Sequence, residues 1–473
     1  MSKEKPTTII ILGGGGDLAQ RKLLPALFDL YVQKNLPEVF QIVGLARTKR
    51  TDEEYQSLVK TAITAQLKKI DESILDEFCK HITYTDGSFD TKDSYDQLLN
   101  SIKTFEDRIH LRSNRLFYLA VPPEHYADIF NNLHTSSLAV SRENSEVWSR
   151  ILVEKPFGNN YESALALDTL LSSLFKEEQI FRIDHYLAKE AVLNILSFRF
   201  ANILLQSAWN KDHVKEVKII MHESINALSR GAFYDAVGAL RDVGQNHLLQ
   251  ILALIAMDEP EEFTAQFIRE RRTELLQKLI PFTKETVNSQ VTRAQYEGFK
   301  DTKGVDPNSQ TETFFEFKTF IDTEAWRDVP FFIQAGKALK TEQVRVEIIF
   351  HDVSTGPFEP KKHATVGNKI ILTISPVQSM NVTLNVKHPG HGYALEPHTL
   401  SFAWDEDTEK GYSAYEKILL DCIDGDQTLF TKTEEVLASW KFITSITDTW
   451  GDIPLQTYEQ GSTGPVNLLC QNK

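Results

Sequence analysis

The sequence predicts an α/β domain followed by a larger α+β domain. The first prediction depends on an apolar, β-branched run at residues 7–12 that leads into four glycines and then into a helical pattern. The second depends on a change of pattern after about residue 180, where apolar helices are followed by segments that alternate between apolar and polar residues. We therefore predict a parallel-sheet domain at residues 1–180 and, at residues 181–473, a domain with a mostly antiparallel sheet and helices on one face.

The chain opens with a β-α-β unit. Residues 7–12, Thr-Thr-Ile-Ile-Ile-Leu, form a continuous apolar run, which is typical of a buried parallel strand. A helix is expected from Asp17 to about Lys34, and residues 41–46 read as a second strand. The apolar positions with helical spacing are Leu18, Leu23, Leu24, Leu27, Phe28 and Tyr31. This unit predicts a Rossmann-like domain.

Residues 115–121 and 150–154 are expected to be two further strands of the same sheet, each followed by a proline-containing turn. In an open α/β sheet, ligands bind outside the carboxyl ends of the strands. Four residues fall at such ends: Gly13, Arg47, Pro122 and Lys155.

In the second domain we expect two strongly apolar helices, near residues 189–205 and 240–257. Strands are expected at residues 216–222, 311–322, 343–350, 368–375 and 380–386. Residues 284–307 are polar and read as a loop, and the tail from Gly461 opens with Gly, Ser and Pro.

The composition limits the kinds of partner. The chain has 473 residues and a net charge of −15, which argues against a general nucleic-acid or anionic-membrane surface, so an anionic ligand needs a local cationic pocket. Its three cysteines, Cys79, Cys422 and Cys470, are too scattered for a disulfide framework or a zinc cluster, and we expect no structural metal. The N-terminal residues lack a signal-peptide core, and the apolar run at 248–257 is too short to span a bilayer, so we expect a cytoplasmic protein.

The turn from Gly13 to Gly16, followed by Asp17 and Leu18, has the features of a pyrophosphate-binding turn. Glycines let the backbone approach the ligand, and the helix N-terminus supplies free N–H groups and partial positive charge. The spacing is not the full G-x-G-x-x-G fingerprint, so a tight turn without a ligand is the alternative. After the second strand stands Arg47 rather than an acidic residue, with Lys49 and Arg50 close behind, which favours NADP over NAD. A solvated cationic loop is the alternative there.

Residues 182–190, Arg-Ile-Asp-His-Tyr-Leu-Ala-Lys-Glu, place an acid, an imidazole, a phenol and an ammonium within six positions. These groups suit a sugar phosphate, because a phosphomonoester carries close to two negative charges and several acceptor oxygens. Tyr186 and Lys189 share a face if a helix has already begun there. A solvated helix face is the alternative.

This stretch resembles the substrate signature of the glucose-6-phosphate dehydrogenase family, whose usual form has Gly in place of Ala188. Three further blocks resemble the family in its order and at similar spacing: residues 13–19, 154–158 and 241–247. The resemblance covers most of the chain. It implies oxidation of glucose 6-phosphate at C1 to 6-phosphoglucono-1,5-lactone with hydride transfer to NADP, the entry step of the oxidative pentose phosphate pathway. It also implies a homodimer or homotetramer built through the antiparallel sheet.

The resemblance assigns roles to individual residues. His247 would be the general base, since an imidazole titrates near neutral pH, and Asp184 would orient it and stabilise the imidazolium. Lys155 would meet both cofactor and substrate, and Lys22 and Tyr118 would lie near the cofactor; a surface charge and a core aromatic are the alternatives for the last two. The residues that would bind the substrate are His185, Tyr186, Lys189, Glu223, Arg230, Asp242 and Lys337.

Some positions depart from the family pattern. A second cation usually follows Lys337 by five residues, but Glu342 stands there; an arginine usually precedes the Gly-Lys pair by two, but the residue is Gln334. Ser375 replaces a glutamine before a proline. Lys340 lies close enough in sequence to supply the missing charge. A charge-assisted hydrogen bond is worth roughly 1.5 to 3 kcal/mol, so its loss would lower phosphate affinity without changing the reaction type.

Two rival functions remain open at this point. Glu342 and Ser375 favour a dehydrogenase for another aldose or aldose phosphate. The other rival is a non-catalytic protein that binds NADP or a sugar phosphate as a regulator, against which the presence of Asp184, His247 and Lys155 argues.

Overall fold

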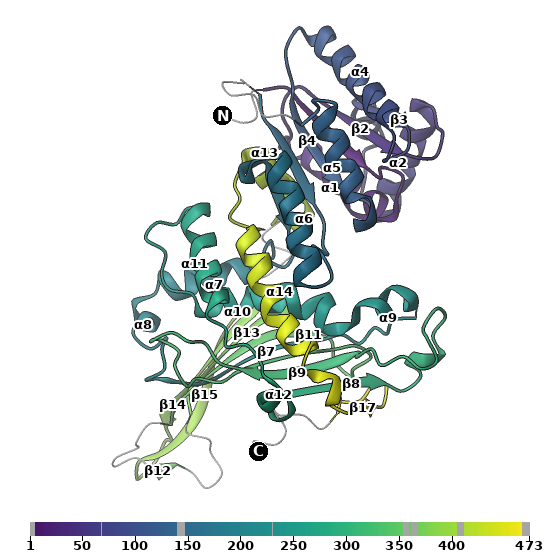
Figure 1. Cartoon of the computed structure of the whole chain (residues 1–473). Coiled ribbons are helices and arrows are strands. Elements are labelled where there is room, and N and C mark those ends of the chain that lie inside the picture. Colours follow the sequence, from purple (N-terminus) through teal and green to yellow (C-terminus); the bar gives the residue numbers. More distant parts are fainter. Residues whose placement is uncertain are drawn as a thin grey trace. The chain divides into compact units, whose positions relative to one another are not determined.

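The computed structural model describes residues 5–67, 69–139, 147–228, 230–352, 359–360, 367–403 and 411–465. The chain divides into two compact units (Figure 1). The first comprises Met1–Ala188, Phe263–Arg269 and Tyr412–Thr433, and the second comprises Lys189–Glu262, Glu270–Gly411 and Glu434–Lys473.

The first unit is built on a sheet that, within the described residues, has seven strands in the order β16-β6-β5-β4-β1-β2-β3. The strands are β1 (Thr7–Leu12), β2 (Phe40–Ala46), β3 (Ile82–Asp86), β4 (Asn114–Leu119), β5 (Ser149–Val153), β6 (Ile180–Ile183) and β16 (Phe430–Thr431). All neighbouring strands run parallel except β16, which pairs antiparallel with β6. The order reverses at β1, as in a doubly wound dinucleotide-binding sheet, so the predicted fold class of this part is confirmed.

Helices separate these strands along the chain. They are α1 (Leu24–Val32), α2 (Asp52–Gln66), α3 (Glu72–Cys79), α4 (Lys92–Ile109), α5 (Tyr126–Thr135), α6 (Tyr161–Leu174) and α13 (Ala414–Asp424), with short turns η2 (Ala19–Leu23), η3 (Pro123–His125) and η4 (Glu177–Gln179). Every residue of β1 is buried, which explains its unbroken apolar run. The start of α2 is fixed by a capping box in which Thr51 and Glu54 bond to each other's backbone N–H groups.

A late segment of the chain, residues 412–433, completes the first unit. Arg150 donates from Nη1 to the carbonyl oxygens of Cys422 and Ile423, at 2.6 and 2.7 Å, and so holds the end of α13. The buried Arg182 bonds to Asp168 and, at 2.7 Å, to the Thr433 hydroxyl. These polar contacts join residues far apart in sequence, and no local pattern in the sequence signals them.

The second unit is built on a larger sheet, with ten strands among the described residues in the order β12-β15-β14-β13-β11-β7-β10-β9-β8-β17. They are β7 (Val214–His222), β8 (Val291–Tyr296), β9 (Phe314–Thr319), β10 (Phe331–Gly336), β11 (Gln343–Phe350), β12 (Glu359–Pro360), β13 (Lys369–Ser375), β14 (Ser379–Lys387), β15 (Ala394–Ala403) and β17 (Leu455–Tyr458). Most pairs are antiparallel, as predicted, whereas β10 with β7, β17 with β8, and β12 with β15 are parallel.

The remaining helical segments include the strongly apolar ones. They are α7 (Glu190–Phe200), α8 (Ile203–Gln206), α9 (Gly231–Ala239), η5 (Leu240–Leu248), α10 (Leu249–Ala256), α11 (Ala265–Gln277), α12 (Lys284–Gln290), η6 (Phe299–Asp301), α14 (Thr433–Thr447) and η7 (Trp450–Asp452). All residues of α10 are buried, and the indole N–H groups of Trp209 and Trp326 donate to carbonyls at its end. The predicted helix at 240–257 is therefore present, but its first half, η5, is a π-helix.

The prediction of a loop at residues 284–307 was wrong, because this stretch contains α12, β8 and η6. Thr283 caps α12 by accepting a hydrogen bond from the Thr286 N–H. In β8 the small and aromatic residues Val291, Ala294 and Tyr296 are buried, and the strand lies between β9 and β17. The polar residues of β8 interrupt its apolar pattern, so the sequence did not indicate a strand there.

Cys79 and Cys422 are buried free thiols, and Cys470 lies outside the described residues. In the part of the chain that the structure describes, no helix has the length and apolar character needed to cross a bilayer.

Candidate active site

The glycine turn follows β1 closely. The Gly13 N–H donates to the Leu45 carbonyl at 2.7 Å, and the Gly16 N–H donates back to the Gly13 carbonyl at 2.8 Å. Gly13 has a φ of +89°, and an added Cβ would lie 2.4 Å from the Ala120 carbonyl oxygen. A side chain at this position is therefore excluded by both conformation and space, so the tight approach of the turn to Ala120 requires glycine.

The helix after this turn starts at Asp17 and passes through the π-turn η2 before α1. Asp17 is exposed and lies 3.7 Å from Arg21, and Lys22 is also exposed. Leu18 is half-buried. Asp17 at the start of the helix and Lys22 on η2 are thus both accessible.

Arg47 is exposed directly after β2, where the sequence analysis placed it. Arg50 is brought closer to the glycine turn than sequence distance suggested. Its Nη1 atom lies 3.1 Å from the position of a Cβ on Gly15, and its guanidinium carbon lies 6.0 Å from the centre of the Tyr84 ring. Of the cations that follow β2, Arg50 therefore lies beside the glycine turn.

Tyr118 is a core residue rather than a surface group, with 1% of its area exposed. Its hydroxyl donates to Glu154 Oε1 at 2.6 Å, and burial raises the pKa of Tyr118. Burial also raises the pKa of Glu154, while the Tyr118 hydrogen bond and the charge of Lys155 lower it. Tyr118 is thus a buried aromatic residue whose hydroxyl holds Glu154, the residue before Lys155.

The signature at residues 182–190 forms a turn between β6 and α7, and α7 begins only at Glu190. Tyr186 and Lys189 therefore precede the helix, so they do not share a helix face. Asp184 is 3% exposed, and its Oδ1 accepts the Tyr186 N–H at 3.0 Å. This bond shapes the turn and leaves His185 and Tyr186 half-buried, with ring centres 5.2 Å apart.

In the second unit, Glu223 and Lys337 form one cluster. Lys337 Nζ lies 2.7 Å from Glu223 Oε2 and 5.1 Å from the centre of the Tyr234 ring. The backbone keeps them together, since the Glu223 N–H donates to Gly336 and the Leu339 N–H donates to the Glu223 carbonyl. Burial, and then the nearby charges of Asp242 and Glu223, raise the pKa of Tyr234. Tyr234 thus belongs to the cluster through its contact with Lys337, although nothing in the sequence pattern singled it out.

Asp242 and His247 both lie on the π-helix η5. His247 is 1% exposed, whereas Asp242 is half-buried. A π-helix is uncommon and is frequently found at functional sites. The sequence pattern predicted a helix here but carried no sign of this wider turn.

Arg230 is exposed immediately before α9, with its guanidinium carbon 4.4 Å from the centre of the Phe233 ring. Lys189 is half-buried at the start of the second unit. Burial lowers the pKa of Lys189 and the negative charge of Glu342 raises it, so Glu342 acts on Lys189 electrostatically.

The departures from the family pattern lie on or next to strands β10, β11 and β13 of the second sheet. Gln334 is buried and its Oε1 lies 2.5 Å from His222 Nε2, while Gln343 reaches the other ring nitrogen. Glu342 is exposed and accepts from the Ser224 hydroxyl at 3.3 Å. Ser375 ends β13, and Lys340 is exposed. Gln334 and Glu342 thus occupy the two positions where the resemblance led us to expect cations.

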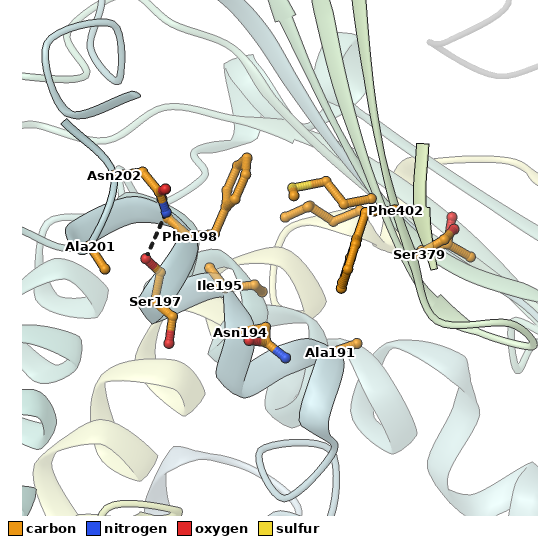
Figure 2. Close-up of a pocket in the computed structure, with 12 residues that line it drawn as sticks. Ala191, Asn194, Ile195, Ser197, Phe198, Ala201, Asn202, Ser379 and Phe402 are labelled. Carbon is orange, nitrogen blue, oxygen red and sulfur yellow. Dashed lines mark hydrogen bonds between the residues drawn. The ribbon is translucent and has the colours of Figure 1, made fainter. Parts of the chain in front are cut away.

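A pocket in the second unit lies between α7 and strands β13–β15 (Figure 2). Asn194, Ile195 and Phe198 approach it from α7, and Phe402 approaches it from β15. No residue predicted for the site lines this pocket. In the described residues, no group of three or more His, Cys, Asp or Glu side chains is placed to hold a metal ion.

The fold and the site together define a class of protein. A doubly wound sheet with a glycine turn after β1 and cations after β2 fits a nicotinamide dinucleotide, and acids, cations and a buried histidine lie on the other candidate segments. The protein is an oxidoreductase with a dinucleotide-binding domain.

Comparisons with known proteins identify the particular family. Residues 10–194 match the family described as "Glucose-6-phosphate dehydrogenase, NAD binding domain", and residues 196–470 match "Glucose-6-phosphate dehydrogenase, C-terminal domain". The chain is 37% identical to a glucose-6-phosphate 1-dehydrogenase of Treponema pallidum, covering 97% of the chain and 92% of that protein. It is 35% identical to the enzyme of the same name from Chlamydia muridarum, covering 97% and 94%. The chain belongs to the glucose-6-phosphate dehydrogenase family.

A solved structure supports the same assignment. A glucose-6-phosphate dehydrogenase in complex with its substrate glucose 6-phosphate has a TM-score of 0.89 and 32% identity, covering 98% of this chain and 96% of that one. The glucose-6-phosphate 1-dehydrogenase from Mycobacterium avium has a TM-score of 0.84 at the same identity, covering 97% and 95%. The predicted family and both parts of the predicted fold are confirmed.

Proposed function

We propose that this protein oxidises glucose 6-phosphate at C1 to 6-phosphoglucono-1,5-lactone and passes the hydride to NADP. The observation that carries this proposal is the match to the family over both domains, at 37% identity to one relative. All residues to which the resemblance gives chemical roles are present. In each unit they lie at or near strand ends, in turns or at the π-helical segments. This reaction is the entry step of the oxidative pentose phosphate pathway.

We propose His247 as the general base. As hydride leaves C1, the hydroxyl proton must be removed, and an imidazole suits that step because its ordinary pKa is near neutral pH. The protein interior around the nearly inaccessible His247 excludes competing water. Asp184 is proposed to orient the ring and to stabilise the imidazolium after it has accepted the proton.

The substrate would be held by complementary groups on several segments. His185, Tyr186 and Lys189 offer donors and charge to the phosphate, and Arg230 offers a further cation. Glu223, Asp242 and Lys337 suit sugar hydroxyls, since the Lys337–Glu223 pair presents a donor and an acceptor side by side.

Bound NADP would accept the hydride. Residues of the first unit are suited to it: the glycine turn Gly13–Gly16 leads into a helix that begins with Asp17 and Leu18 and continues to Lys22, and the N–H groups of a helix N-terminus suit a pyrophosphate. Arg47 is proposed to bind the ribose 2′-phosphate with Arg50 beside it, and Lys155 to meet both ligands.

A single assay tests the reaction. Purified protein is mixed with NADP and, in parallel, glucose 6-phosphate, free glucose and other hexose phosphates, and NADPH absorbance is followed. We expect reduction with glucose 6-phosphate, and His247→Asn should lower turnover by a factor of roughly 10² to 10⁴ with little change in substrate binding. The proposal fails if glucose 6-phosphate gives no NADPH, and the role of His247 fails if the variant keeps near-native turnover.

One observation favours a second candidate, a dehydrogenase for another aldose or aldose phosphate. Glu342 acts electrostatically on Lys189, one of the cations proposed for the phosphate. Faster NADP reduction with another sugar in the same assay would support this candidate. A shift of melting temperature with NADP, but no reduction with any sugar, would indicate a non-catalytic binding protein.

We also propose a homodimer or homotetramer built through the hairpin β14–β15. Four apolar side chains of this hairpin are exposed: Leu384, Val386, Leu400 and Phe402. Exposed apolar patches of this kind mark interaction surfaces. A cytoplasmic location is proposed as well, because two Arabidopsis thaliana relatives that are 36% identical are named as cytoplasmic enzymes.

A further inference from the structure

A break in the helix precedes the segment that carries Asp242 and His247. Gly238 has φ 75° and ψ 167°, which separates α9 from the π-helix η5. The N–H groups that follow such a break have no helical partner of their own and need acceptors. Both of the next two N–H groups find one on the same residue: Ala239 donates to the Glu312 carbonyl at 3.1 Å, and Leu240 donates to Glu312 Oε1 at 2.9 Å.

Glu312 fills the break closely. It is 2% exposed, and a Cβ added to Gly238 would lie 2.4 Å from its Oε1 atom. The side chain is therefore fixed by packing, and a buried carboxylate at the start of a helix also complements the positive end of the helix dipole.

Thr313, the residue after Glu312, supports the turn that carries Lys337. The Thr313 carbonyl accepts the Lys337 N–H at 3.0 Å, and the Thr313 hydroxyl lies 2.9 Å from the Tyr458 hydroxyl. Tyr458 in turn donates to the Lys337 carbonyl at 2.7 Å. Residues 312 and 313 thus contact the backbone of the His247 segment on one side and that of the Lys337 turn on the other.

We propose that Glu312 is a positioning residue for catalysis: its carboxylate holds the start of η5 and thereby sets the orientation of Asp242 and His247. This inference rests on the proposed role of His247. Burial raises the pKa of Glu312, whereas the positive charges of Arg241 on η5 and Arg293 on β8 lower it. The negative charge of Glu312 in turn raises the pKa of Tyr234 on α9. Because Glu312 is buried behind the helix, it acts through backbone geometry and not through contact with the substrate.

The test compares three substitutions at Glu312 by steady-state kinetics. Glu312→Ala removes the acceptor, and Glu312→Asp keeps the charge but shortens the side chain; both should lower kcat on the order of ten- to a hundredfold, the effect of a small misplacement of catalytic groups. The KM for NADP should stay unchanged, because the cofactor residues lie in the first unit. Glu312→Gln retains an oxygen that can accept the Leu240 N–H, and should restore kcat to within about fivefold of wild type.

Glu106 provides a matched control in the first unit. It is also buried, and its Oε1 accepts the Ser113 N–H at 3.0 Å. Glu106→Ala should lower the melting temperature without lowering kcat. The inference is overturned if folded Glu312→Asp or Glu312→Ala keeps near-native kcat, or if Glu312→Gln loses as much as Glu312→Ala. These outcomes are distinct from failure of the proposed function, in which the wild-type protein gives no NADPH with glucose 6-phosphate, and from failure of the role of His247, in which His247→Asn keeps near-native turnover.

Discussion

At the scale of single residues, the cations proposed to bind the substrate lie near carboxylates. Lys337 is paired with Glu223 at 2.7 Å, and Lys189 is acted on by Glu342. A cation that already faces a carboxylate binds an incoming phosphate less strongly, because the ligand competes with the existing partner. The affinity for an anionic sugar therefore depends on the acids of this site as much as on its cations.

The first residue-scale prediction concerns Glu342. Glu342→Gln removes a negative charge near Lys189 and should lower the KM for glucose 6-phosphate about two- to fivefold, which corresponds to the modest energies of exposed charge pairs, with kcat unchanged. Steady-state kinetics at low and high salt checks this, since added salt should reduce the difference. Glu347, which pairs with Arg345 at 2.7 Å, gives the control variant Glu347→Gln. An unchanged or higher KM in Glu342→Gln would contradict the prediction.

The second residue-scale prediction concerns Arg47. Arg47→Ala should raise the Kd for NADP by about tenfold or more and leave that for NAD nearly unchanged, because only NADP carries a 2′-phosphate that an arginine can bind through two parallel hydrogen bonds. Fluorescence titration with both dinucleotides measures the two constants. Arg50→Ala is the informative companion, since Arg50 lies beside Gly15. Equal losses for NADP and NAD in Arg47→Ala would remove Arg47 from the proposed role.

The sequence could predict which residue types form the candidate site but not how they are supported. Asp184, Glu223, Lys337 and His247 stand in recognisable blocks. Glu312 carries no such signal, because its function arises from a contact with a backbone N–H more than seventy positions away, Leu240.

At the scale of elements, two π-helical turns occur where chemistry is proposed. η2 follows the glycine turn, and η5 carries Asp242 and His247. Apolar periodicity predicts that a helix exists but does not distinguish a π-turn from an α-turn, since one inserted residue changes the pattern little. Strands with clear alternation, such as β11 and β13, were predicted almost to the residue, whereas β8 was missed because its polar positions hide a short buried face.

An element-scale prediction follows from the pKa of Glu312. Burial raises this pKa from 4.5 to about 6, so the folded protein holds the proton more tightly than the unfolded chain does. The resulting stabilisation is fully present below pH 4.5 and is lost as the pH rises to about 6, a loss of about 2 kcal/mol at 1.36 kcal/mol per pKa unit. Glu312→Gln cannot lose a proton. Its stability relative to wild type should therefore increase between pH 4.5 and 6.

Urea unfolding of both proteins across this pH range, followed by tryptophan fluorescence, measures the difference. The second unit contains the buried Trp326 and Trp440, which report on its unfolding. A constant difference between the two proteins from pH 4.5 to 6.5 would contradict the raised pKa.

At the scale of the whole molecule, the order of elements along the chain does not follow the division into units. Strand β16 and helix α13 come late in the sequence but complete the first unit. Local sequence patterns cannot predict that these late elements belong to the first unit, because this depends on long-range contacts such as those of Arg150 and Arg182. By contrast, the parallel sheet could be predicted, because its strands alternate with helices along one continuous stretch.

The last prediction concerns assembly. Figure 1 shows β14 and β15 as a long hairpin that projects beyond the rest of its sheet. Leu400 is 64% exposed and Phe402 is 53% exposed, and both lie on one face because side chains two apart in a strand point the same way. Their cross-strand partners on that face are Val382 and Met380, so the apolar surface continues across both strands.

A charge on this face should break an assembly built through it. Leu400→Asp should shift the protein to a monomer in size-exclusion chromatography with light scattering at micromolar concentration, because a carboxylate buried at an interface without a partner costs several kcal/mol. Ser401→Asp adds the same charge to the opposite face of the same strand and should leave the assembly intact. If wild type is already monomeric, or if both variants assemble alike, the hairpin is not the interface, and its apolar face must serve another contact.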